Sequence, residues 1–163
     1  RAQGMDEVQT ILQESYPEFD SLIKGNEELW KKLSDSDSFT IFAPSSAAYK
    51  ALGEDRKKQL KDPRNGELAE KIGMYHAIGE EVTAEALFNA GGVITMGGEV
   101  SIERNRSGGM FGVGGTEDGV KVGNSKVVQS INVGSGVIHE VDGFIHPFLL
   151  WRYADQLRIP GSQ

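Results

Sequence analysis

Hydrophobic positions follow two different periods along this chain. Over residues 6–33, apolar side chains recur three or four residues apart, which predicts helices with one buried face. From residue 93 onward, apolar and polar positions alternate over short runs that glycines separate, which predicts strands. A helical first half and a strand-rich second half indicate an α+β fold, with helices packed on an antiparallel or mixed sheet.

The expected elements have recognisable ends. Helices are predicted over residues 6–33 in three pieces, and then over 54–61, 67–77 and 83–87. Asp6, Asn26 and Thr83 are the expected N-caps, because their side-chain oxygens can accept from free N–H groups of a first helical turn. Asn65-Gly66 is expected to form a turn. Strands are predicted over residues 93–96, 100–103, 120–122, 126–133 and 137–141.

The stretch Phe39 to Leu52 predicts a sharp corner in the core. Phe39 to Phe42 alternates aromatic and β-branched residues, which suits a short buried strand. Pro44 lacks a backbone donor and ends the strand, and Ser45 or Ser46 can cap the helix that follows as far as Gly53.

The C-terminal residues 147–163 have an unusual pattern. They begin as an apolar helix whose large side chains occupy almost every position rather than one stripe. Some of these side chains are therefore expected to stay exposed, as an interaction site requires. Trp151 and Tyr153 are the candidate partner-binding residues here.

Composition limits the function classes. The 163 residues suffice for one domain with a core, and the net charge of −7 argues against nucleic acid and anionic lipid surfaces as partners. There is no cysteine, which excludes disulfides and thiolate chemistry. No apolar run approaches the roughly 20 residues of a membrane helix, so a soluble, non-spanning chain is expected.

Candidate chemistry is weak. His139 shares a strand face with two valines and is expected to be buried, neutral and hydrogen-bonded. A zinc site using His76, His139 or His146 lacks the usual ligand spacing, and no G-x-S-x-G elbow or phosphate-loop pattern is present. No metal, no cofactor and no enzyme activity are therefore expected.

The glycine-rich segment 105–119 predicts a long hairpin loop. It begins with Asn105-Arg106-Ser107, a glycosylation sequon that matters only in a secretory pathway, so Asn105 is a glycosylation candidate.

Three motifs in order carry a family resemblance. Thr40-Ile-Phe-Ala-Pro-Ser-Ser-Ala-Ala-Tyr49, then Tyr75-His76, then GVIHEVDGFIHP over residues 136–147 resemble the conserved boxes of the fasciclin-like FAS1 domain. The resemblance covers residues 6–149, which we take as one domain, and leaves 150–163 as a C-terminal tail.

The resemblance implies helices on a β-sandwich-like sheet formed mainly by the C-terminal half. By resemblance, eight residues hold the fold: Thr40, Phe42, Pro44, Ser45, Gly136, His139, Asp142 and Pro147. Tyr75 and His76 lie in a region that some members use for receptor contact. The Asp-Ile pair of integrin-binding members is Ser130-Ile131 here, with no carboxylate, which argues against integrin-type adhesion.

The leading hypothesis is a non-enzymatic adhesion or protein-interaction module that binds a protein or extracellular-matrix partner, in an extracellular or periplasmic location. One alternative is an accessory subunit of a larger membrane complex, for instance on the thylakoid-lumen side of a photosynthetic complex in a chloroplast. Another is a small-ligand carrier with a cleft between helices and sheet.

Overall fold

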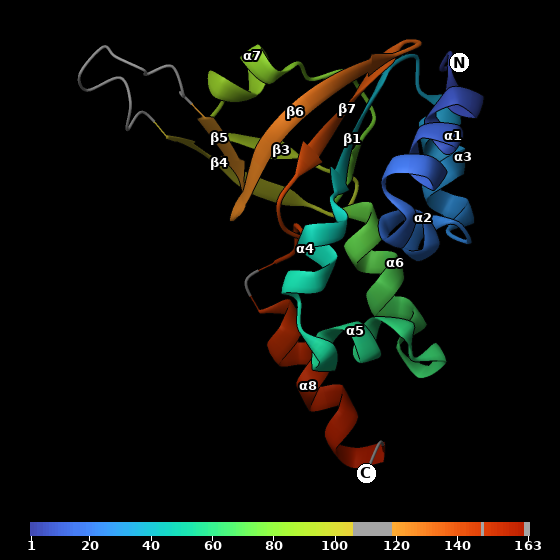
Figure 1. The fold of residues 1–163 in the computed structure, drawn as a ribbon, viewed down its shortest axis with the longest axis vertical. Helices are drawn as coiled ribbons and strands as arrows, with labels where there is room; N and C mark the ends of the chain where they lie inside the picture. Colours follow the sequence, from blue (N-terminus) through green and yellow to red (C-terminus); the bar gives the residue numbers. More distant parts are fainter. Residues whose placement is uncertain (106–118, 148, 162–163) are drawn as a thin grey trace.

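A computed structural model describes residues 1–105, 119–147 and 149–161 of the chain (Figure 1). Its α-helices are α1 Met5–Ser15, α2 Pro17–Ile23, α3 Glu27–Asp35, α4 Ser46–Ala51, α5 Glu54–Lys61, α6 Gly66–Met74, α7 Ala84–Phe88 and α8 Leu150–Gly161, with a 3-10 turn at Pro63–Asn65. Its strands are β1 Phe39–Pro44, β2 Ala77–Ile78, β3 Gly92–Ile94, β4 Glu99–Asn105, β5 Gly119–Val122, β6 Ser125–Val133 and β7 Gly136–Val141.

Three of the predicted helix caps are confirmed. The side chain of Asn26 accepts from the N–H of Leu29, and Thr83 accepts in the same way at the start of α7. Of the two candidate serines before α4, Ser45 is the cap, since its hydroxyl accepts from the N–H of Ala48. Each of these side chains accepts a hydrogen bond from one N–H group that has no partner within the first turn of the helix.

Two predictions near helix ends are wrong. Asp6 does not cap α1, because the helix begins at Met5 after Gly4, whose φ of 94° turns the chain without a side-chain cap. Asp6 instead lies in the first turn, where its charge favours the positive end of the helix dipole. The helix predicted over residues 67–77 is also too long at its end, since α6 begins at Gly66, directly after the 3-10 turn, and ends at Met74.

The sheet is mixed, which is one of the two arrangements that the sequence left open. Its seven strands follow the order β2-β1-β7-β6-β5-β4-β3, and the only parallel pair among the described strands is β1 with β7. In that pair Phe39 lies opposite Gly136 and Phe42 opposite His139. Both strands are central and are covered on both faces, which explains why almost every residue in them is buried.

The sheet curls strongly. β6 pairs with β7 along most of its length and with β5 at its start, with a register shift between Val127 and Gln129 that bends the strand. The N–H of Met96, just after β3, donates to the carbonyl of Ala77 in β2. The two ends of the strand order therefore meet.

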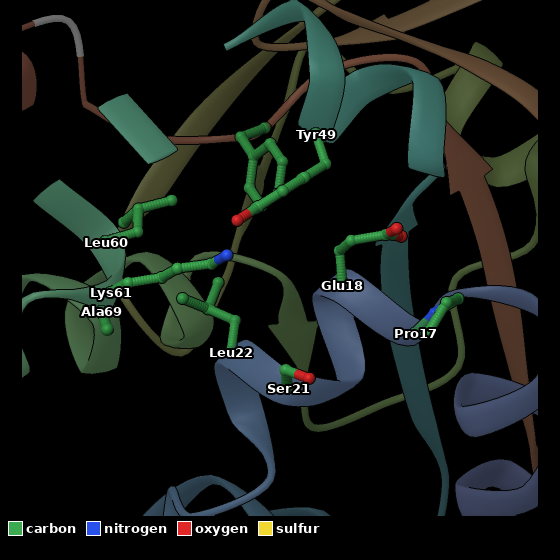
Figure 2. Close-up of a pocket in the computed structure, with 9 residues that line it drawn as sticks. Pro17, Glu18, Ser21, Leu22, Tyr49, Leu60, Lys61 and Ala69 are labelled. Carbon is green, nitrogen blue, oxygen red and sulfur yellow. The ribbon is translucent and has the colours of Figure 1, made fainter. Parts of the chain in front are cut away.

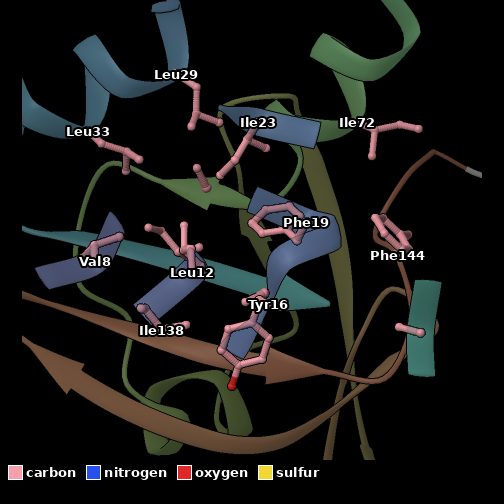
Figure 3. Packing of buried hydrophobic residues seen from close by; sticks show 14 of the residues in the cluster. Val8, Leu12, Tyr16, Phe19, Ile23, Leu29, Leu33, Ile72, Ile138 and Phe144 are labelled. Atoms are coloured by element: carbon pink, nitrogen blue, oxygen red, sulfur yellow. The ribbon is translucent and has the colours of Figure 1, made fainter. Parts of the chain in front are cut away.

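Two hydrophobic clusters lie on opposite faces of β1 and β7. The first is between the strands and the N-terminal helices (Figure 3), and its members include Val8, Leu12, Phe19, Ile23, Leu29, Leu33, Phe39, Ile41 and Ile138. The second lies inside the curl of the sheet, and includes Phe42, Ile78, Leu87, Val100, Ile102, Val120, Val122, Val141 and Ile145. The alternation of side chains along a strand divides these residues, so Ile138 and Val141 of β7 lie on opposite faces.

Gly136 is required by a close approach. A Cβ atom at this position would lie 2.5 Å from the ring and the carbonyl oxygen of Phe39, its partner across the parallel pair. Any larger residue would force β7 away from β1. This contact accounts for the glycine at the start of the third sequence motif.

The tail packs onto the domain. Leu150 and Ala154 of α8 are buried in the first cluster, and Arg56 of α5 forms a 2.6 Å ion pair with Asp155. The same carboxylate accepts from the side-chain amide of Gln59. α8 runs beside α5 and then extends away from the sheet (Figure 1). Residues 106–118 of the predicted hairpin loop lie outside the described residues.

Candidate functional site

The first motif forms a buried junction. Thr40 is fully buried, and its hydroxyl donates to the carbonyl of Glu80 and accepts from the N–H of Val82, at 2.7 Å each. Pro44 is the last residue of β1, and the N–H of Ser45 donates to the carbonyl of Val141. These bonds hold β1, β7 and the segment after β2 together.

His139 is buried, as predicted. Its ring stacks on Phe42 at 5.6 Å between centroids, its Nε2 is 2.8 Å from the carbonyl of Val82, and its Nδ1 is 2.7 Å from the hydroxyl of Ser130. A carbonyl can only accept, so Nε2 carries the proton and Nδ1 accepts from Ser130. Burial lowers the pKa of His139, which keeps the ring neutral. Ser130, the first residue of the Ser130-Ile131 pair, is thus the hydrogen-bond donor to this histidine.

His76 is also fully buried, between Phe19 and Phe144. Its Nδ1 donates to the carbonyl of Ile72, and its Nε2 accepts from the N–H of Ile145 at 2.9 Å. Burial lowers its pKa to about 4. The ring therefore joins the end of α6 to the segment after β7.

Tyr75 and His76, which the resemblance places in a region of receptor contact, have buried side chains. His76 has no exposed surface, and Tyr75 is 9% exposed, with its ring against Gly97 and Gly98. A partner that binds at this region would therefore contact the residues that cover Tyr75 and His76 rather than these two side chains. Periodicity on α6 could not show this, because the covering residues come from α2 and from the chain after β7.

The remaining motif residues have local roles. The carboxylate of Asp142 accepts from the N–H of Lys126 at 2.7 Å, which extends the pairing of β6 with β7. The carbonyl of Pro147 accepts from the N–H of Leu150, the first residue of α8. Asn105 ends β4, and the other two residues of its sequon lie outside the described residues.

Trp151 and Tyr153, the two candidate partner-binding residues of the tail, differ in their exposure. Trp151 is half-buried: its indole N–H donates to Nε2 of His146 at 3.0 Å, and the guanidinium of Arg56 lies 4.8 Å from its ring. Tyr153 is 53% exposed and Leu149, one helical turn earlier, is 55% exposed. We call Leu149, the residue just before α8, and Tyr153 the outer face of α8.

A groove of about 610 Å³ opens between α2, α4, α5 and α6 (Figure 2). Its apolar lining comes from Pro17, Leu22, Leu60, Ala69 and Phe144. Polar groups of Glu18, Tyr49 and Lys61 stand at its sides. Phe144 lies over the buried ring of His76, so the groove lies above the second sequence motif.

Tyr49 has a cationic surrounding. The ammonium groups of Lys57 and Lys61 lie 5.6 and 5.9 Å from the centre of its ring. The sequence predicts a helix at Tyr49 but carries no signal of the groove, because the groove walls come from four helices that no single periodicity links.

Metal binding and membrane spanning find no support in the described residues. Within residues 1–105, 119–147 and 149–161, no three His, Asp or Glu side chains cluster as metal ligands. No helix in the described part of the chain is long and apolar enough to cross a bilayer.

Comparisons with known proteins agree with this architecture. A family model described as "Fasciclin domain" matches residues 14–147. "Protein sll1483" of Synechocystis sp. (strain ATCC 27184 / PCC 6803 / Kazusa) is 31% identical over 121 residues, which are 74% of this chain and 61% of that protein. The chain thus spans about three-fifths of that relative's length.

A solved structure shows the same fold. The FAS1 domain pair from the insect cell adhesion molecule Fasciclin I matches with a TM-score of 0.64 and 16% identity, over 80% of this chain and 45% of that one. At that identity the match shows the fold alone. Because the family model covers most of the chain, including the first and third motifs and the buried histidines, the chain belongs to the Fasciclin (FAS1) domain family.

Proposed function

We propose that this chain is a non-catalytic protein-binding module whose partner docks on the outer face of α8. Fasciclin domains are generally non-enzymatic and often act in adhesion or protein interaction. The motif residues that resemble those of other members hold this fold together from within. The binding surface therefore lies among other, exposed residues.

The observation that carries the proposal is the pairing of two exposed apolar side chains at the start of α8, one on the residue before the helix and one in its first turn. Four large hydrophobic residues are strongly exposed in the described chain, and two of them, Leu149 and Tyr153, lie one turn apart. The N–H of Tyr153 donates to the carbonyl of Leu149. Residues four apart share a helix face. Buried Leu150 and Ala154 hold the opposite face, so the helix presents this pair on a fixed support.

We place the partner outside the cytoplasm, in the extracellular or periplasmic space, because fasciclin domains are commonly secreted. The partner is a protein or a matrix component with an apolar patch that the outer face of α8 can cover. Tyrosine suits such contacts, since it has a large apolar ring and a polar tip.

The test compares two baits in an extract of the native source. The double variant Leu149→Ser, Tyr153→Ser should lose at least about tenfold of the partner that the wild-type chain retains, because exposed aromatic anchors often dominate binding. Ile94→Ser, at a residue that is 75% exposed on β3, is the matched control and should retain the partner. Both variants should keep the wild-type thermal transition.

The outcome also identifies the partner's class. Recovery of a single secreted or matrix protein supports the adhesion-type reading, and recovery of a large membrane assembly makes the chain an accessory subunit. Equal retention by wild type and the double variant contradicts the outer face of α8 as the docking surface.

A further inference from the structure

The groove between α2, α4, α5 and α6 has the composition of a site for an amphiphile. We propose that it binds a free fatty acid, with the alkyl chain on the apolar floor and the carboxylate at Lys61 and Tyr49. This inference uses no residue of the outer face of α8, so either proposal can fail without the other.

The apolar floor is fixed by the core beneath it. Leu60 and Phe144 are each only 8% exposed, and Phe144 packs edge-on against the buried ring of His76 at 5.7 Å between centroids. Leu22 and Ala69 complete the floor from α2 and α6. A preformed apolar surface of this kind favours an apolar ligand without a cost for ordering the site.

The walls disfavour a peptide occupant. The groove lies between helices, whose backbone groups are already paired, so an extended peptide would leave its own N–H and C=O groups without partners. An alkyl chain has no polar backbone and is thin enough to enter.

Lys61 and the Tyr49 hydroxyl supply the positive charge and the hydrogen-bond donor of the head-group site. Lys57 forms a 2.7 Å ion pair with Glu54, whereas Lys61 makes no ion pair with a described residue. The Tyr49 hydroxyl likewise has no hydrogen bond to the described residues. Figure 2 shows this hydroxyl and the Lys61 ammonium pointing toward one another in the groove. An ammonium and a phenol together match one monovalent carboxylate.

The charges around the groove orient the ligand. The side chain of Glu18 accepts from the hydroxyl of Ser46 at 2.6 Å and keeps negative charge near α2. α5 carries four basic residues against two acidic ones, although the whole chain has a net charge of −7. The anionic head is thus attracted to the α5 side and repelled from the α2 side.

The test is calorimetric titration of the whole chain with laurate below its micelle concentration. Binding should be saturable, should raise the thermal midpoint, and should weaken roughly fourfold per methylene removed from the chain. Lys61→Met should weaken it about fivefold to tenfold, and Tyr49→Phe about threefold. Lys58→Met removes an exposed charge from the same helix outside the groove and should leave affinity within about twofold.

Three results would overturn the proposal. The first is the absence of saturable laurate binding in a folded wild-type chain. The second is equal binding of dodecyltrimethylammonium, which has the same tail and the opposite charge, or tighter binding of dodecyl phosphate. The third is an equal loss in Lys58→Met and Lys61→Met, which would mean diffuse attraction to α5 rather than a head-group site.

Discussion

His76 shows how burial fixes the protonation state of one side chain. Its two ring nitrogens have complementary partners, a carbonyl at Nδ1 and an N–H group at Nε2. A proton added at Nε2 would face the N–H of Ile145 and remove that hydrogen bond. The neutral ring is therefore the only form that satisfies both neighbours.

From this we predict an acid-sensitive fold. The pKa of His76 falls from 6.5 in the unfolded chain to about 4 in the fold, so the unfolded chain binds the proton first. Stability from this residue is complete above pH 6.5 and declines as the pH falls toward about 4, by about 3 kcal/mol in total. Urea unfolding across this range should show the decline.

The matched variant is His76→Gln, which keeps a polar neutral group in the site. It should be less stable than wild type at neutral pH, but its stability should fall less between pH 6.5 and 4. Equal slopes in the two proteins would mean that other groups, such as buried His139, carry the pH dependence. A ring resonance of His76 that titrates near 6.5 would contradict the assigned protonation state.

At the scale of one element, α8 separates a structural face from an exposed one. Leu150 is 3% exposed and Tyr153 is 53% exposed, although the two positions are only three apart in the sequence. We predict that Leu150→Ala lowers the free energy of unfolding by about 2–3 kcal/mol, because it leaves a cavity in the first cluster. Tyr153→Ala should cost less than about 0.5 kcal/mol. Chemical denaturation of the two variants measures both values.

The reverse order of effects would place the tail differently. If Tyr153→Ala destabilised the fold more than Leu150→Ala, the outer face of α8 would be packed, and the docking proposal would lose its basis. If neither variant changed stability, α8 would contribute nothing to the core.

Elements were predictable wherever a local interaction decides them. The caps at Asn26, Ser45 and Thr83 follow from one polar side chain and the N–H three residues later. The N-cap prediction at Asp6 was wrong because Gly4, two residues earlier, turns the chain into α1 without a side-chain cap. The alternation in β7 correctly predicted that His139 is buried, because a strand has only two faces and His139 shares its face with two valines.

What the sequence could not supply is the pairing of distant segments. β1 and β7 are about a hundred residues apart and pair in parallel, yet neither carries a local signal of its partner. The groove depends on four helices in the same way, and the burial of His76 depends on Phe19 and Phe144 from remote segments. The family motifs located these residues in the chain but not their exposure.

At the scale of the whole molecule, β1 and β7 join the two hydrophobic clusters. Each strand supplies one face to each cluster, so neither cluster can lose its packing without exposing a strand of the other. This arrangement predicts one cooperative unfolding transition rather than separate melting of the helices and the curled sheet. A substitution in the second cluster should therefore be felt by a probe in the first.

Trp30 is that probe, since it packs against the first cluster and its indole N–H donates to the carbonyl of Ile23. The chain has two tryptophans, so a Trp151→Phe background makes Trp30 the only reporter. In this background Val122→Ala, a fully buried position on β5, should cost about 2 kcal/mol and lower the thermal midpoint seen by Trp30 by about 4–8 °C. Far-UV circular dichroism should shift by the same amount. A Trp30 midpoint that stays fixed while the circular dichroism midpoint falls would mean that the clusters unfold independently, and that β1 and β7 do not couple them.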